Sequence, residues 1–151
     1  MCTVLAPPPL APAWPWQAPG NWLAFAVALV LVAVGCAVGI VGVRRQTDAR
    51  RRRIGWVLLL AMTLCLIIGL FLILIVVYPA IDALNSWESQ QDQAVRAQGC
   101  SAAAWLSLDH LALRTIQNVH YAGGGLTYLG FLLFTLLGWQ YPLKAVRPGS
   151  L

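Results

Sequence analysis

The sequence predicts an all-α integral membrane protein with three transmembrane helices and an extramembrane helical hairpin between the second and the third. The chain is 60% hydrophobic and 10% charged, whereas soluble domains carry about 25% charged residues. Two uncharged apolar runs, residues 22–43 and 54–81, are each long enough for the helix of roughly 20 residues that crosses a bilayer. At 151 residues, the chain is expected to form one domain.

The N-terminal segment, residues 1–21, contains six prolines and no charged side chain. Proline at this density excludes a regular helix and favours extended polyproline II segments and turns. Two interpretations remain open, a disordered tail or a strap along the membrane surface with its tryptophans among the headgroups, where tryptophan is enriched. Trp14 and Trp16 of this segment, together with Trp105, are the candidates for contact with a partner.

A basic turn, residues 44–53, separates the first two apolar runs. It reads RRQTDARRRR and holds six arginines. An arginine at the bilayer centre costs about 2.5–3.5 kcal/mol, so the turn must lie outside the hydrocarbon. The two runs therefore form a membrane hairpin.

Small residues mark one stripe on each of these two predicted spans, where they would let another helix approach closely. The stripes consist of Ala28, Gly35, Gly39 and Gly42 in the first span and of Ala61, Cys65 and Gly69 in the second. Gly35 and Gly39 form a GxxxG pair. Because the basic turn is short, the two spans should be antiparallel neighbours, and the second stripe is expected to face the first span.

The segment between the second and third spans, residues 82–118, is predicted to form a helical hairpin outside the membrane, either standing or lying flat. The second span is expected to bend at Pro79 and its extension to end near Gly99. Each arm carries an apolar stripe at helical spacing. The stripes are Leu84, Trp87, Gln91 and Val95 in one arm and Trp105, Leu108, Ala112, Ile116 and Val119 in the other.

The third span is predicted at residues 119–141, with the glycine triplet 123–125 as a bend or a close-packing point, and a basic tail follows at 142–151. Eight of the ten Lys and Arg residues lie just beyond the ends of apolar runs. By the positive-inside rule, the basic turn and the C-terminus are cytoplasmic, and the N-terminus and the hairpin lie on the other side. The predicted location is a bacterial inner or photosynthetic membrane.

The predicted spans contain no Asp, Glu, Lys or Arg. This argues against a pump, ion channel or secondary transporter built from one chain. The flanking position of the positive charge argues against nucleic acid as a partner, and no soluble substrate is inferred. The four cysteines have no metal-like spacing, and adjacent Asp109 and His110 would face different directions on a helix. We therefore predict no catalytic residue and no metal site.

Two further candidate sites remain. His120, at the outer edge of the third span beside the glycines, could ligate haem or chlorophyll. Cys2 and Cys100 both fall on the predicted non-cytoplasmic side, where a disulfide can form, and the alternative is two free thiols.

These features favour a non-catalytic accessory or assembly subunit of a larger integral membrane complex, such as a respiratory or photosynthetic one, with other membrane subunits and lipid as its partners. Two alternatives stay open. One is a cofactor-carrying subunit that binds haem or chlorophyll, and the other is a small transporter or channel formed by a homo-oligomer.

Overall fold

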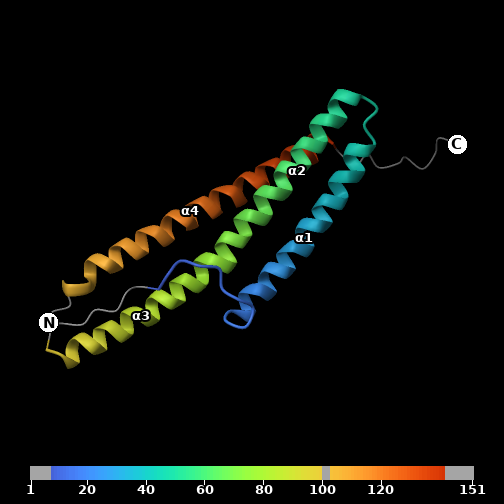
Figure 1. The fold of residues 1–151 in the computed structure, drawn as a ribbon. Helices are drawn as coiled ribbons and strands as arrows, with labels where there is room; N and C mark the ends of the chain where they lie inside the picture. Colours follow the sequence, from blue (N-terminus) through green and yellow to red (C-terminus); the bar gives the residue numbers. More distant parts are fainter. Residues whose placement is uncertain (1–7, 100–102, 142–151) are drawn as a thin grey trace.

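The structure is a computed structural model that describes residues 8–99 and 103–141, with side chains in the second range from residue 110 onwards. Every regular element in these ranges is helical: α1 (Pro19–Arg44), α2 (Ala49–Phe71), the π-helix η1 (Leu72–Val77), α3 (Tyr78–Ala97) and α4 (Ala103–Gln140). Figure 1 shows α1, α2 and the second half of α4 side by side, while α3 and the first half of α4 extend beyond them as a pair. Three helical stretches, Pro19–Arg44, Ala49–Ala97 and His110–Gln140, are long and apolar enough to span a membrane.

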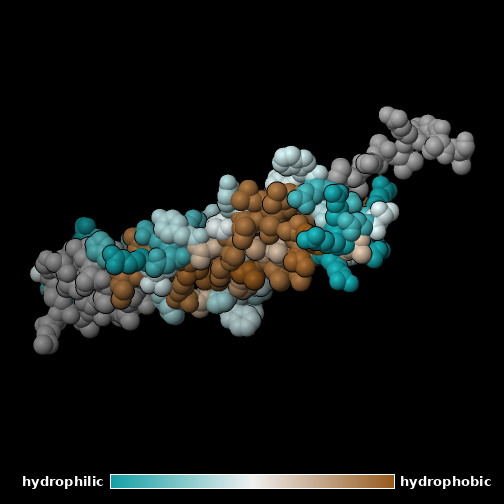
Figure 2. Space-filling view, turned by 90° about the horizontal axis from the view of Figure 1, so that it is seen from above, coloured by the Kyte–Doolittle hydropathy of each residue, from teal (hydrophilic) through white to brown (hydrophobic). Residues whose placement is uncertain are grey.

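The connection between α1 and α2 is shorter than the basic turn that the sequence outlines. Asp48 starts α2 as its N-cap, because its Oδ1 atom accepts a hydrogen bond of 2.9 Å from the Arg50 N–H. Four of the six arginines, 50–53, therefore lie in the first turns of α2 rather than in a loop. All six arginines are exposed at one end of the molecule, where Figure 2 shows a hydrophilic cap next to a hydrophobic band.

The second apolar run passes Pro79 without leaving the helical conformation. The chain is helical from Ala49 to Ala97, and the six residues of η1 take up the π-helical hydrogen-bonding pattern immediately before the proline. Proline has no N–H to donate to the carbonyl four residues earlier. The π-helix is rare and occurs mostly as a single turn inside a longer α-helix, as it does here.

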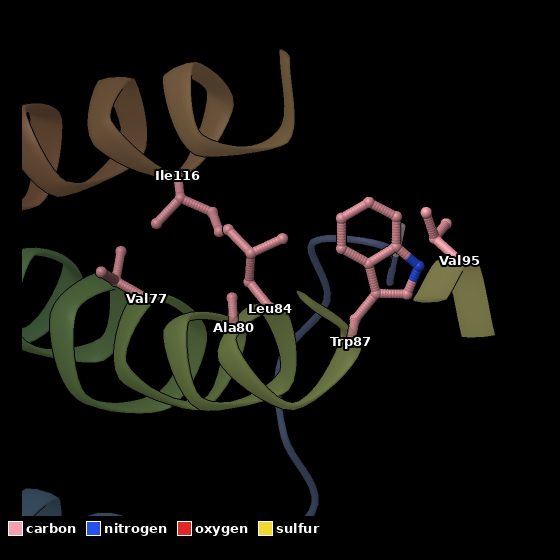
Figure 3. Packing of buried hydrophobic residues seen from close by; sticks show 6 residues of the cluster. All are labelled: Val77, Ala80, Leu84, Trp87, Val95 and Ile116. Atoms are coloured by element: carbon pink, nitrogen blue, oxygen red, sulfur yellow. The ribbon is translucent and has the colours of Figure 1, made fainter. Parts of the chain in front are cut away.

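Beyond Pro79, α3 packs against α4 through a stripe of buried apolar side chains. The buried cluster consists of Val77, Ala80, Leu84, Trp87, Val95 and Ile116. Figure 3 shows Ile116 of α4 pointing at Leu84 of α3, with Val77 and Ala80 on one side and Trp87 and Val95 on the other. The predicted stripe of α3 is thus the buried one. Gly99 ends this region with a φ of 65°, the left-handed conformation that commonly follows a helix C-terminus.

The third apolar run belongs to a single helix of 38 residues, α4, which continues through the glycine triplet. For this triplet, the sequence left a bend and a close-packing point open. Glycine permits a change of backbone direction but does not impose one. Gly123 instead serves as a close-packing point, because a Cβ atom there would lie 3.2 Å from the Gly69 carbonyl oxygen of α2.

Candidate partner and cofactor sites

The closest helix contact in the structure is between α2 and α4, at Gly69. A Cβ atom at Gly69 would lie 2.5 Å from the Thr127 Oγ1 atom, 2.7 Å from the Thr127 backbone nitrogen and 2.8 Å from the Gly123 carbonyl oxygen. The space is therefore filled by backbone as well as side chain. The sequence predicted that the Ala61–Cys65–Gly69 stripe faces the first span. The structure places Gly69 against α4 instead, while Ala61 and Cys65 are half-buried.

The small residues of α1 are shared between its two neighbours. Gly39 faces Leu59 of α2, where a Cβ atom would lie 2.7 Å from the Leu59 Cδ1 atom. A Cβ atom at Gly35 would lie 3.3 Å from the ring of Phe134 in α4, and one at Gly42 would lie 2.8 Å from the Tyr141 carbonyl oxygen. Ala28 lines an apolar groove between α1 and α4.

The helix-packing residues of α4 were missed in the sequence. Gly123 and Thr127 face Gly69, and Gly130 accommodates Leu66, whose Cγ atom would lie 2.6 Å from a Cβ atom there. Their spacing of four and three residues places them on one face of a helix. The same search for small residues that marked the first two spans would have found them.

The two cysteines within the predicted spans do not pair with each other. Cys36 Sγ lies 3.0 Å from Thr63 Oγ1, and the Thr63 hydroxyl donates to the Leu59 carbonyl oxygen at 2.8 Å. Because Thr63 has one hydroxyl proton, the Cys36 thiol is the donor to Thr63. This contact links α1 to α2 and indicates a structural role for Cys36.

Residues 8–18 form a strap that binds to the helices at the level of Pro79. The Ala13 N–H donates a hydrogen bond of 3.0 Å to the carbonyl of Ile75, the residue that Pro79 leaves without an α-helical donor. The Ala13 carbonyl in turn accepts one of 2.8 Å from the Trp22 indole N–H of α1. Leu10 packs against the apolar cluster of α3 and α4. Ala13 thus connects η1 to the start of α1.

The two tryptophans of the strap point away from these contacts. The rings of Trp14 and Trp16 stack in parallel with centroids 5.2 Å apart, and the two residues are 60% and 74% exposed. They form an exposed aromatic pair beside the start of α1. Trp105, Cys2 and Cys100 lie outside the residues whose side chains the structure describes, as does the predicted basic tail at 142–151.

His120 lies on an exposed face of α4, with its ring 6.2 Å from that of Tyr121, which is 71% exposed. A haem or chlorophyll held by His120 would therefore sit at the outer surface of the helices and need a second protein to enclose it. Among the described residues, no group of three or more His, Cys, Asp or Glu side chains could hold a metal ion.

One polar side chain is buried in the stripe between α3 and α4. Gln91 is 0% exposed, and neither its Oε1 nor its Nε2 atom has a hydrogen-bond partner among the side chains that the structure describes. An unsatisfied buried polar group costs roughly 1–3 kcal/mol. Gln91 therefore weakens the outer end of the α3–α4 pair relative to an apolar residue.

Comparison of the chain with protein-family models, curated proteins and solved structures found no match.

Proposed function

We propose that the protein is a non-catalytic accessory or assembly subunit of a larger integral membrane complex, with α1 and the strap as its contact surface for another membrane subunit. The observation that carries this proposal is the outward face of α1. Its large apolar residues are between 43% and 68% exposed: Leu23, Val27, Val30, Leu31, Val34, Val38 and Val41. Their spacing places them along one side of the helix.

The aromatic pair of the strap supports the same surface. Trp14 and Trp16 are exposed next to the N-terminal end of α1, so that an apolar helix face and two indole rings are presented together. Tryptophan is enriched where proteins bind partners because it offers a large contact area at a low entropic cost. A neighbouring subunit that covered α1 would also meet these rings.

The apolar spans support a non-catalytic role. They contain no Asp, Glu, Lys or Arg, although transport and proton-transfer paths generally use such residues at membrane depth. The remaining chemistry-bearing residue near a span, His120, is exposed.

In the proposed orientation, the six arginines between α1 and α2 lie in the cytoplasm, as the positive-inside rule requires. The strap, α3 and the first half of α4 then lie on the opposite side, where the α3–α4 pair forms the extramembrane hairpin. A reporter fused after Leu151 should remain cytoplasmic. Export of that reporter would reverse the orientation and remove the proposed placement of the strap.

A photo-crosslinking residue at Val30, which is 62% exposed on α1, tests the proposed surface. In native membranes it should give one abundant adduct with a different integral membrane protein that co-purifies at a fixed ratio. The matched control places the same group at Leu59, which is 6% exposed and faces α1 from within the chain. Replacing both Trp14 and Trp16 with alanine should reduce the Val30 adduct.

Two results would replace the proposal by one of its alternatives. A closed ring of identical chains, isolated without other proteins and crosslinked to itself from Val30, would indicate a homo-oligomeric transporter or channel. An absorption band of haem or chlorophyll in the purified protein, lost in His120→Ala, would indicate a cofactor-carrying subunit.

A further inference from the structure

An apolar groove runs between α1 and α4, with α2 as its floor. Its widest part has a volume of about 330 Å³ and is bordered by Ala28 and Leu31 of α1 and by Phe131 and Phe134 of α4. Met62 and Leu66 of α2, which are 1% and 5% exposed, close its base. The groove exists because Gly35 meets the large Phe134 ring rather than another small residue, so that α1 and α4 do not close on each other.

The groove continues toward the arginines. A second hollow of about 60 Å³ shares Gly35, Met62 and Phe134 with the first and extends to Gly138 and Tyr141. Tyr141 marks the end of α4, and its hydroxyl donates a hydrogen bond of 2.7 Å to the Arg51 carbonyl oxygen. The narrow end of the groove therefore opens beside the connection between α1 and α2.

The arginines at this end form an excess of positive charge, because residues 44–53 hold six arginines and one acidic residue, Asp48. Arg44 and Arg45 at the end of α1 and the four arginines that begin α2 are all exposed. Within the described residues, the ion pair that the structure records is Arg96–Asp92 in α3, far along the chain from this cluster. Clusters of four to eight basic residues next to a membrane span attract anionic lipid headgroups.

We infer that the groove binds one acyl chain of an anionic phospholipid whose phosphate lies at the arginines between α1 and α2. From Ala28 to Val38 the groove follows about 15 Å of α1, and its far end at Ala28 lies about 24 Å along the helix from Arg44. In a hydrocarbon core of roughly 30 Å, the groove therefore runs from the arginine-side leaflet across the middle of the bilayer. The narrow hollow lies at the headgroup side and the wide part near the middle of the bilayer. A lipid of the arginine-side leaflet fits this direction, with its chain end in the wide part.

The size of the groove allows an acyl chain, but not a helix, to lie inside it. A methylene group is similar in size to a water molecule, which occupies about 30 Å³, so the wide part holds on the order of ten methylene groups. A helix about 10 Å in diameter and 15 Å long occupies on the order of 1,000 Å³. This inference does not rest on the proposed function. The groove shares Leu31 and Val38 with the outward face of α1 but is otherwise lined by residues of α2 and α4 and by other residues of α1.

Photoactivatable lipids test the inference in vesicles that contain the purified chain. Phosphatidylglycerol with a diazirine in the half of one acyl chain nearest its terminal methyl group should label groove residues such as Leu31 and Phe134. The same acyl chain on phosphatidylcholine should label them at least tenfold less. Replacing Arg44 and Arg45 with glutamine should reduce the preference for phosphatidylglycerol.

Two glycines of α4 provide a matched pair of variants. At both Gly138 and Gly125, an added Cβ atom would meet nothing within 4 Å. Gly138 lines the narrow hollow of the groove, whereas Gly125 lines neither hollow. Gly138→Leu should therefore reduce groove labelling at least tenfold, and Gly125→Leu should leave it unchanged. Ala28→Phe obstructs the wide part independently, and circular dichroism checks that each variant is folded.

Three results would overturn the inference: equal labelling by the two lipids, labelling that Gly138→Leu and Ala28→Phe leave unchanged, or labelling spread equally to Val30 on the outward face. A protein–protein crosslink from Phe134 in place of the lipid adduct would show that a helix occupies the groove.

Discussion

Helix α4 meets its two neighbours in opposite ways. Against α2, the backbone of α4 at Gly123 and Thr127 lies directly on Gly69 of α2, so that the two helices are in backbone contact. Against α1, Gly35 faces the ring of Phe134, and a groove of about 330 Å³ remains beside it. Small residues draw two membrane helices together when both helices supply them at the same level. At Gly35, where α4 supplies a large ring instead, a hollow remains beside the contact.

The largest difference in the free energy of unfolding should come from replacing one leucine in each neighbour of α4, Leu66 of α2 and Leu31 of α1, with alanine. Leu66 is 5% exposed and packs against Gly130, so Leu66→Ala should lower the free energy of unfolding by about 3 kcal/mol through the cavity that it leaves. Leu31 borders the groove and is 68% exposed. Leu31→Ala should change the stability by less than about 0.5 kcal/mol. Equal losses in unfolding by sodium dodecyl sulfate would contradict the comparison.

A second pair of variants adds a methyl group instead of removing atoms. Gly69→Ala places a Cβ atom against the Thr127 backbone nitrogen and the Gly123 carbonyl oxygen, which cannot move independently of α4. It should cost about 2 kcal/mol of stability. Gly125→Ala enters open space and should instead stabilise α4 by about 0.5 kcal/mol, since alanine favours a helix over glycine. The same unfolding experiment measures both, and a neutral Gly69→Ala would refute direct backbone contact.

Because α1 leaves a groove along α4, hydrogen bonds at its ends matter more to its position. Trp22→Phe removes the 2.8 Å hydrogen bond from the indole of α1 to the Ala13 carbonyl, at a cost of about 1 kcal/mol. Amide hydrogen exchange in residues 8–18 should accelerate about fivefold. Trp16→Phe, at a position that is 74% exposed, should leave the exchange unchanged. Equal acceleration in both variants would argue against the strap as a link to α1.

The smallest effect is expected at the contact between α1 and α2. Cys36→Ala removes the thiol that lies 3.0 Å from Thr63 Oγ1. Hydrogen bonds between membrane helices contribute about 0.6 kcal/mol on average, so the loss should be of that size. A double-mutant cycle with Thr63→Val separates the pair from the packing change. A coupling energy of zero would show that Cys36 contributes through packing alone and not through a hydrogen bond to Thr63.

The sequence was sufficient for the three apolar helices, which follow from the length of uncharged apolar runs, and for the buried stripe of α3, which follows from helical spacing. Both are properties of single segments. It was not sufficient for the helix partners. The short connection before Asp48 makes α1 and α2 adjacent in the chain, but Gly69 packs on α4, whose matching residues lie far away in the sequence. Likewise, Pro79 shows that the Ile75 carbonyl needs a donor, but only the folded chain shows that Ala13 provides it.

The hydrogen bond from Ala13 to Ile75 also fixes an order of events in biogenesis. A ribosome makes Ala13 first, and Ile75 follows only after the whole of α1 and the whole of α2 have been translated. Residues 8–18 therefore cannot form this hydrogen bond until α2 and the start of η1 have been made. Docking of the strap is a late step in folding, and a protease directed at residues 8–18 should distinguish finished chains from nascent ones.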